Sequence, residues 1–193
     1  MTTISIWIDP GCPWTWRTSR WLRSVAAVRR LDIDWHVMSL VVLNEHREIP
    51  AAFRERLAES WRLVRLLAAA RAEGGSFAVG RLYDAVGTTI HEQGHQPDDN
   101  DVEAALDAAG LPRKLAAARD DRAFDAVVRD SHAKGQQRVG TESGSPVIAI
   151  GDGPGYFGPV VTAPPDARDA ERLLDALILV SAVPTFSELK RAR

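Results

Sequence analysis

The chain has 193 residues, of which 45% are hydrophobic, so it can bury one sizeable core or one core with a modest inserted subdomain. Its 24 Lys and Arg residues and 26 Asp and Glu residues give a net charge of -2, which excludes a general electrostatic attraction to nucleic acid or anionic membranes. The single cysteine cannot form an internal disulfide, and the start of the chain lacks the pattern of a secretory signal. We therefore expect a soluble cytoplasmic protein whose partners are small molecules or other proteins.

The first elements that the sequence predicts are a strand, a helix and a second strand. Residues 4–8 form an alternating segment rich in β-branched and aromatic side chains that stops at a Pro-Gly turn, which favours a strand. A helix is expected from Pro13, because apolar residues then recur at three- and four-residue steps. Residues 33–43 are the candidate for the second strand. Together these elements predict a right-handed, parallel β-α-β unit.

The middle of the chain, residues 50–134, has helical periodicity instead. Glycine-rich or proline-rich breaks at 74–75, 94–100 and 110–112 divide it into about four helices. Strand patterns return at 146–150 and 156–157, joined by a Gly-rich hairpin connection. A last helix is expected over 166–181, with Asp166 as its N-cap.

This element order predicts an α/β protein with a thioredoxin fold that carries an inserted all-helical domain. A β-α-β half and a β-β-α half, separated by a helical block, is the plan of that fold. We assign residues 1–46 and 138–193 to the thioredoxin-like domain and residues 47–137 to the helical insert.

Cys12 is the first candidate for a reactive group, because it lies at the turn between the first strand and the first helix. The unpaired amides and positive dipole end of that helix are expected to lower the pKa of the thiol and favour the nucleophilic thiolate. Pro13 is tolerated there, since a residue in the first helical turn has no intrahelical amide bond to lose. The alternative is that Cys12 is a small buried hydrophobic residue.

Several motifs together resemble the actinobacterial mycothiol-dependent nitroreductases. They are Asp-Pro-Gly-Cys-Pro-Trp-Thr-Trp at 9–16, Thr-Ser-Arg-Trp at 18–21, Trp-His-Val-Met-Ser-Leu at 35–40, Leu-Asn-Glu at 43–45 and Phe-Gly-Pro at 157–159. That family belongs to the DsbA-like branch of the thioredoxin superfamily, beside kappa-class glutathione transferases and 2-hydroxychromene-2-carboxylate isomerases. The similarity runs from residue 4 to residue 191.

The resemblance implies an oxidoreductase that uses mycothiol, or a similar low-molecular-weight thiol, as cosubstrate and electron source, with no tightly bound cofactor. The family's nucleophile, the first cysteine of a Cys-Pro-Trp-Cys pair, corresponds to Cys12, whereas Thr15 replaces the second cysteine. A mixed disulfide at Cys12 must then be resolved by an external thiol, since attack on a disulfide needs a second thiolate. We expect a monothiol mechanism that reduces a small electrophilic, nitro or disulfide substrate; a homodimer is an open option.

Thr15 and the Ser145-Pro146 dipeptide are expected to complete the site around the sulfur. The Thr15 hydroxyl, one helical turn after Cys12, can donate a hydrogen bond to the sulfur anion, or it can be a tolerated replacement of the lost cysteine. Thioredoxin-like folds place a cis-proline against the catalytic cysteine, and by resemblance the backbone of Ser145 would pair with the bound thiol. An ordinary trans proline that opens an edge strand is the alternative.

Substrate contacts are expected from Pro13, Trp14 and Asn44. Trp14 can stack on an aromatic substrate beside the thiolate, although a packing role is equally open. Asn44 follows the second strand, at the edge where open α/β sheets collect ligands, or it can serve as a cap.

Three other functions are compatible with parts of the sequence. Cys12 can position the thiol of a cosubstrate without reacting, as in a kappa-class-like transferase or isomerase. His91-Glu92-Gln93-Gly94-His95 matches the His-Glu-x-x-His pattern of zinc hydrolases, although Gly94 and Pro97 disfavour the helix that such a site needs. A binding or chaperone module that has lost catalysis with its second cysteine is the third.

Overall fold

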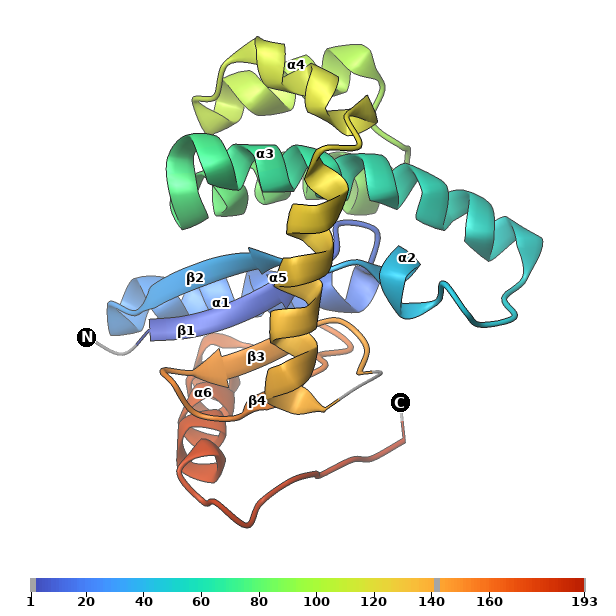
Figure 1. Ribbon diagram of the computed structural model, residues 1–193. Coiled ribbons are helices and arrows are strands. Elements are labelled where there is room, and N and C mark those ends of the chain that lie inside the picture. Colours follow the sequence, from blue (N-terminus) through green and yellow to red (C-terminus); the bar gives the residue numbers. More distant parts are fainter. Residues whose placement is uncertain (1–2, 141–142, 193) are drawn as a thin grey trace.

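The computed structural model describes residues 3–140 and 143–192. Strand β1 (Thr3–Ile8) enters helix α1 (Pro13–Arg29), and strand β2 (Asp32–Val37) then pairs with β1 in parallel. Figure 1 shows this β-α-β unit in the centre of the molecule. The predicted first half of the fold is therefore confirmed.

The second half of the fold adds two antiparallel strands and a helix. Strand β3 (Val147–Ile150) pairs with β1, and strand β4 (Gly155–Phe157) pairs with β3, which gives the sheet order β2-β1-β3-β4. Helix α6 (Ala167–Ser181) follows, and the Asp166 side chain accepts a bond from the Asp169 N–H, as an N-cap should. The predicted hairpin and last helix are both confirmed.

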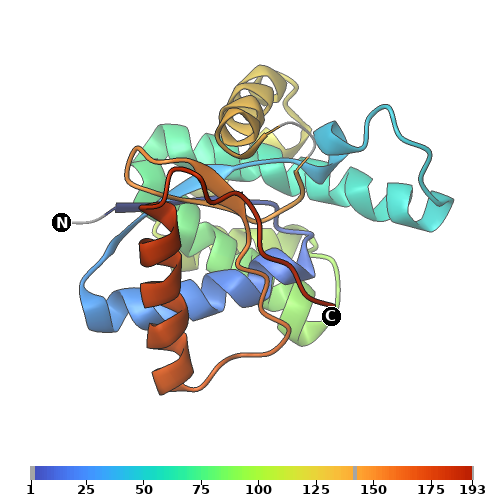
Figure 2. The same cartoon turned by 90° about the horizontal axis from the view of Figure 1, so that it is seen from below.

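Helices cover both faces of this sheet (Figures 1 and 2). Helices α1 and α6 lie together on one face, where the Trp21 indole donates to the Ala170 carbonyl at 3.0 Å. The other face carries α5 (Phe124–Val139), and the Trp7 indole donates to the Ser131 carbonyl of that helix at 3.0 Å. Because adjacent residues of β1 point to opposite faces, Ile6 and Ile8 enter the main core while Trp7 packs under α5.

The middle of the chain is helical, as predicted. Helix α3 (Ala51–Thr88) has non-helical dihedrals at Gly74 and Gly75, and the positive φ of 69° at Gly75 accounts for a glycine at the break. The elements in chain order are α2 (Leu40–Leu43), α3 (Ala51–Thr88), the π-helix η1 (Thr89–Gln93), α4 (Asp99–Ala109), the 3-10 helix η2 (Arg113–Asp120) and α5.

The core is continuous between the sheet and this helical segment. Buried residues of β1 such as Ile6 and of α3 such as Leu66 and Leu82 belong to one hydrophobic cluster. The expected division into residues 1–46 with 138–193 and residues 47–137 stays a prediction. No helix within the described ranges combines the length and apolarity that crossing a bilayer requires.

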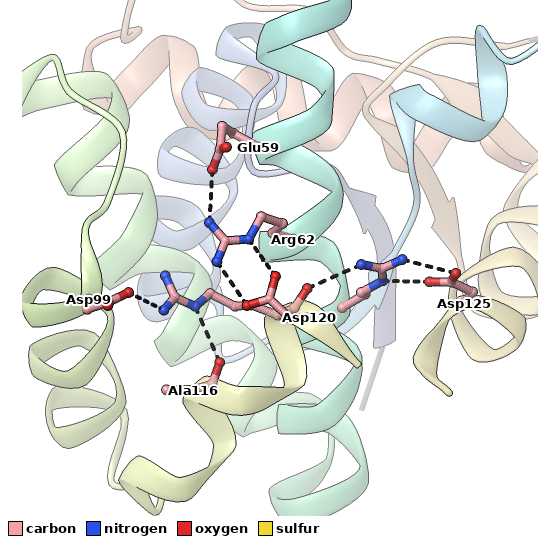
Figure 3. A network of polar contacts seen from close by, with 8 residues as sticks. Glu59, Arg62, Asp99, Ala116, Asp120 and Asp125 are labelled. Atoms are coloured by element: carbon pink, nitrogen blue, oxygen red, sulfur yellow. Dashed lines mark hydrogen bonds and ion pairs between the residues drawn. The ribbon is translucent and has the colours of Figure 1, made fainter. Parts of the chain in front are cut away.

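Ion pairs connect α3 to the elements that follow it (Figure 3). The Arg62 guanidinium donates to the Asp120 carboxylate at 2.9 Å, and that of Arg65 donates to Asp125 at 2.6 Å. Arg119, on η2, reaches Asp99 on α4 at 2.5 Å. These contacts fix η2 and the start of α5 against α3, and so set the position of α5 over the sheet.

The prediction of a second strand over residues 33–43 is wrong in its second half. The strand ends at Val37, and residues 40–43 form the short helix α2. The physical reason is Ser39, whose hydroxyl accepts bonds from the N–H groups of Val41 and Val42 and thereby caps α2. This helix is one of the elements that contact the candidate site.

The contact between α3 and α1 is tight at Gly87, where a β-carbon would overlap the Trp16 ring. We expect Gly87→Ala to lower the free energy of unfolding by roughly 1–3 kcal/mol, because overpacking forces shifts in a dense core. Chemical denaturation measures this change. In a Trp16→Phe background the same substitution should cost less; an equal cost would show that the two residues are not in steric conflict.

Candidate functional site

Cys12 is buried where the N-terminus of α1 meets the loop before β3. It is the N-cap of α1, its N–H donates to the Asp9 carbonyl at 3.1 Å, and it is 3% exposed. Its thiol donates to the Ser145 carbonyl at 3.5 Å. The Ser145-Pro146 bond is cis, as the resemblance implied, and so is Gly158-Pro159, which the sequence did not reveal. Two segments far apart in the sequence thus meet at the sulfur.

Thr15 lies in the same buried cluster and contacts both Cys12 and Ser145. Its side chain is 0% exposed, and its hydroxyl shares a 2.5 Å hydrogen bond with the Ser145 hydroxyl. The hydroxyl and the backbone N–H of Thr15 also form hydrogen bonds with the Cys12 sulfur. The structure therefore brings together Cys12, Thr15, Ser145 and Pro146.

Burial dominates the acidity of Cys12. Loss of hydration raises the pKa of the thiol, and the hydrogen bonds from the side chain and N–H of Thr15 act in the opposite direction. The negative charge of Asp9 adds a smaller increase of the pKa. The expectation that the helix end keeps Cys12 as a thiolate is thus wrong for this state, because desolvation outweighs the amides at the helix end.

The remaining predicted residues lie around this cluster, and of these only Trp14, through its backbone N–H, bonds to the sulfur in a described contact. Pro13 is exposed and Trp14 is half-buried, with the Arg17 guanidinium 5.2 Å from its ring centre. The Asn44 side chain ends α2 by donating to the Leu40 carbonyl at 2.7 Å. That contact is the capping role considered for Asn44; a substrate contact for Pro13, Trp14 or Asn44 stays a prediction.

The two histidines of the zinc-like motif have separate partners. The ring of His91 donates from Nε2 to the Pro10 carbonyl at 2.9 Å, whereas Nε2 of His95 lies 3.0 Å from the Asp101 carboxylate. The π-helix η1 ends at Gly94, as the glycine suggested. Within the described residues no three His, Cys, Asp or Glu side chains are grouped to hold a metal. The His91 ring thus bonds to the turn that carries Cys12.

Sequence reasoning missed the contacts that hold this turn in place. The sequence indicates for Asp9 only a place in the motif at 9–16, yet its carboxylate is fully buried and accepts bonds from three segments. Ser60 on α3 is one of those donors. The available signal was an acidic residue at the end of a hydrophobic strand, three residues before a reactive cysteine.

We expect Thr15→Val to raise the pKa of Cys12 by roughly one unit, because the variant loses the hydroxyl that bonds to the sulfur. Ultraviolet titration of the thiolate measures it. The matched control is Thr18→Val, which removes a buried hydroxyl of the same helix that donates instead to the Pro159 carbonyl at 2.8 Å. An unchanged pKa in Thr15→Val would contradict a role of Thr15 at the sulfur.

Known structures share this fold at low sequence identity. A probable DsbA oxidoreductase from Streptomyces coelicolor matches with a TM-score of 0.64 and 20% identity, covering 100% of this chain and 95% of that one. The cytosolic disulfide reductase DsbM from Pseudomonas aeruginosa with GSH gives a TM-score of 0.60 at 17% identity, covering 92% and 99%. A 2-hydroxychromene-2-carboxylate isomerase gives 0.63 at 15% identity, covering 91% and 94%. The thioredoxin-like, DsbA-like fold class is confirmed.

Sequence comparison identifies the family. Residues 11–191 match the model of the Rv2466c-like family, described as mycothiol-dependent nitroreductase Rv2466c. The uncharacterized protein Rv2286c of Mycobacterium tuberculosis is 32% identical over 100% of this chain and 83% of its own length. The resemblance seen in the motifs is confirmed: this chain belongs to the Rv2466c-like family of mycothiol-dependent nitroreductases, which are thiol-dependent oxidoreductases.

Proposed function

We propose that the protein is a monothiol oxidoreductase in which Cys12 exchanges with mycothiol, or a similar low-molecular-weight thiol, to reduce a small electrophilic, nitro or disulfide substrate. The observation that carries this proposal is the buried cluster of Cys12, Thr15 and the Ser145-Pro146 dipeptide. Thr15 occupies the position of the family's second cysteine, and the chain contains no other cysteine. Reduction therefore needs a thiol from outside the chain.

The steps are balanced most simply for a disulfide substrate. The Cys12 thiol first loses its proton, and the thiolate attacks one substrate sulfur, forming a mixed disulfide and releasing the other sulfur as a thiolate that takes up the proton. An external thiolate then attacks the mixed disulfide and frees Cys12. A second exchange outside the protein completes the two-electron reduction, so that two cosubstrate thiols become one disulfide.

The residues of the cluster have separate tasks in this scheme. The hydrogen bonds that Thr15 makes to the sulfur favour the thiolate that must form in the first step. The Ser145 carbonyl accepts the thiol hydrogen at 3.5 Å in the resting state and is available to an incoming thiol once that hydrogen has left. Trp14 and Asn44, at the rim, are proposed to contact the substrate.

One observation favours a second candidate function. Burial raises the pKa of Cys12, and the thiol donates to a carbonyl, which suits a group that positions a cosubstrate sulfur without attacking. A kappa-class-like transferase or isomerase works in that way. Mass spectrometry of the protein incubated with the disulfide of the cosubstrate separates the two, since only the oxidoreductase acquires a mixed disulfide at Cys12.

Replacement of the proposed nucleophile is the direct test. We expect Cys12→Ser to lower thiol-dependent turnover at least about hundredfold, since a serine hydroxyl is a far weaker nucleophile than a thiolate and cannot form the mixed disulfide. Undiminished turnover would refute the assignment. Circular dichroism of the variant, which changes one buried atom, controls for folding.

The Thr15→Cys variant tests the monothiol part of the proposal. A cysteine at that position can attack the mixed disulfide within the chain, so the adduct at Cys12 should be replaced by an internal disulfide. Mass spectrometry reads both species. Persistence of the adduct at the level of the unmodified protein would show that position 15 does not face the mixed disulfide.

A further inference from the structure

The Asp9 carboxylate is 0% exposed and has only neutral hydrogen-bond partners among its described contacts. Oδ1 accepts from the Gly11 N–H at 2.8 Å and from the Ser60 hydroxyl at 2.5 Å. Oδ2 accepts from the Leu40 N–H at 2.7 Å. A carboxylate without a cation is uncommon in a protein interior, because removal from water is costly unless the charge is well hydrogen-bonded.

The donors around Asp9 favour its ionised form. Each carboxylate oxygen faces a backbone N–H, and such a group can only donate. Burial raises the pKa of Asp9 above its usual value, and the bonds from Leu40, Ser60 and Gly11 offset part of that increase. The carboxylate therefore accepts hydrogen bonds from three elements: the turn after β1, α2 and α3.

The same bonds fix the turn that carries Cys12. Leu40 begins α2 and Ser60 lies on α3, so Asp9 fastens both helices to the turn after β1. The approach to α3 is close, since a β-carbon at Gly11 would lie 3.0 Å from the Ser60 hydroxyl oxygen. The Cys12 N–H in turn donates to the Asp9 carbonyl. The position of Cys12 thus depends on Asp9 through these hydrogen bonds.

We propose that Asp9 is a positioning residue for Cys12: its buried carboxylate anchors the active-site turn, and its negative charge adds to the burial of the sulfur in opposing formation of the thiolate. This inference rests on the proposed function of Cys12. It adds that the reactivity of Cys12 is limited in the resting protein, because a neutral thiol resists oxidation and alkylation. Reaction then depends on the hydrogen bonds that the bound cosubstrate and Thr15 provide to the anion.

The other titratable groups around the turn do not supply a second anion. Burial lowers the pKa of His91 and of His132 and raises that of Tyr83, so all three side chains are neutral near neutral pH. Arg17 is exposed on α1 and is not an anion. These groups are Arg17 on α1, Tyr83 on α3, His91 on η1 and His132 on α5.

The Asp9→Asn and Asp9→Ser variants test the proposal, because both remove the charge while each retains a group that can accept the Gly11 N–H bond. We expect the pKa of Cys12 to fall by about one unit in each, which raises the thiolate fraction roughly tenfold at a pH below both values. Iodoacetamide alkylation should accelerate about threefold, since a less basic thiolate is a weaker nucleophile. Thiolate ultraviolet absorbance measures the pKa, with Cys12→Ser as the blank.

The control is Asp84→Asn, which removes a partly buried carboxylate of α3 that pairs with Arg23 at 2.8 Å. The pKa of Cys12 should not change in that variant. An unchanged or higher pKa of Cys12 in a folded Asp9 variant would overturn the proposal. So would a carboxyl carbon NMR resonance that shows Asp9 protonated at neutral pH in the unmodified protein, a measurement that needs no variant. Because neither readout requires turnover, failure of the catalytic assignment would be seen separately.

Discussion

The burial of one sulfur atom is the constraint on which the rest of the site depends. Cys12 ends the turn after β1, and its side chain is enclosed where α1 begins and the Ser145-Pro146 loop passes. Desolvation there favours the neutral thiol, so any anion formed during the reaction must be stabilised by fixed hydrogen bonds. Thr15 provides these bonds, and its own 2.5 Å contact with Ser145 holds it in place.

The helical segment between the two halves of the fold holds the active-site turn from outside. Ser60 on α3 bonds to Asp9, and His91 on η1 bonds to the Pro10 carbonyl. The His91 ring also stacks on Trp16 of α1, with ring centres 5.5 Å apart. Residues far from Cys12 in the sequence therefore help to determine where it lies. The bond from His91 to Pro10 gives that histidine a structural role that needs no metal.

Sequence reasoning succeeded where a feature has a local cause and missed features that depend on distant partners. The strand 147–150, the Asp166 cap and the place of Cys12 at the start of α1 follow from patterns of a few residues. The end of β2 was misjudged, because the strand-like Val41 and Val42 are recruited into α2 by the Ser39 cap. The sequence marks Asp9 as an acidic residue at the end of a hydrophobic strand but not its partners Leu40 and Ser60, which lie 31 and 51 residues away in sequence.

If Cys12 works with a thiol from outside the chain, the stoichiometry of its reaction with a disulfide shows it. The most direct measurement mixes the reduced protein with a coloured aromatic disulfide in the absence of any other thiol, and counts the coloured thiol released per chain. A single cysteine with Thr15 at the partner position predicts release of one equivalent and a protein that remains a mixed disulfide until mycothiol is added. Release of two equivalents, or of none, would refute the monothiol scheme.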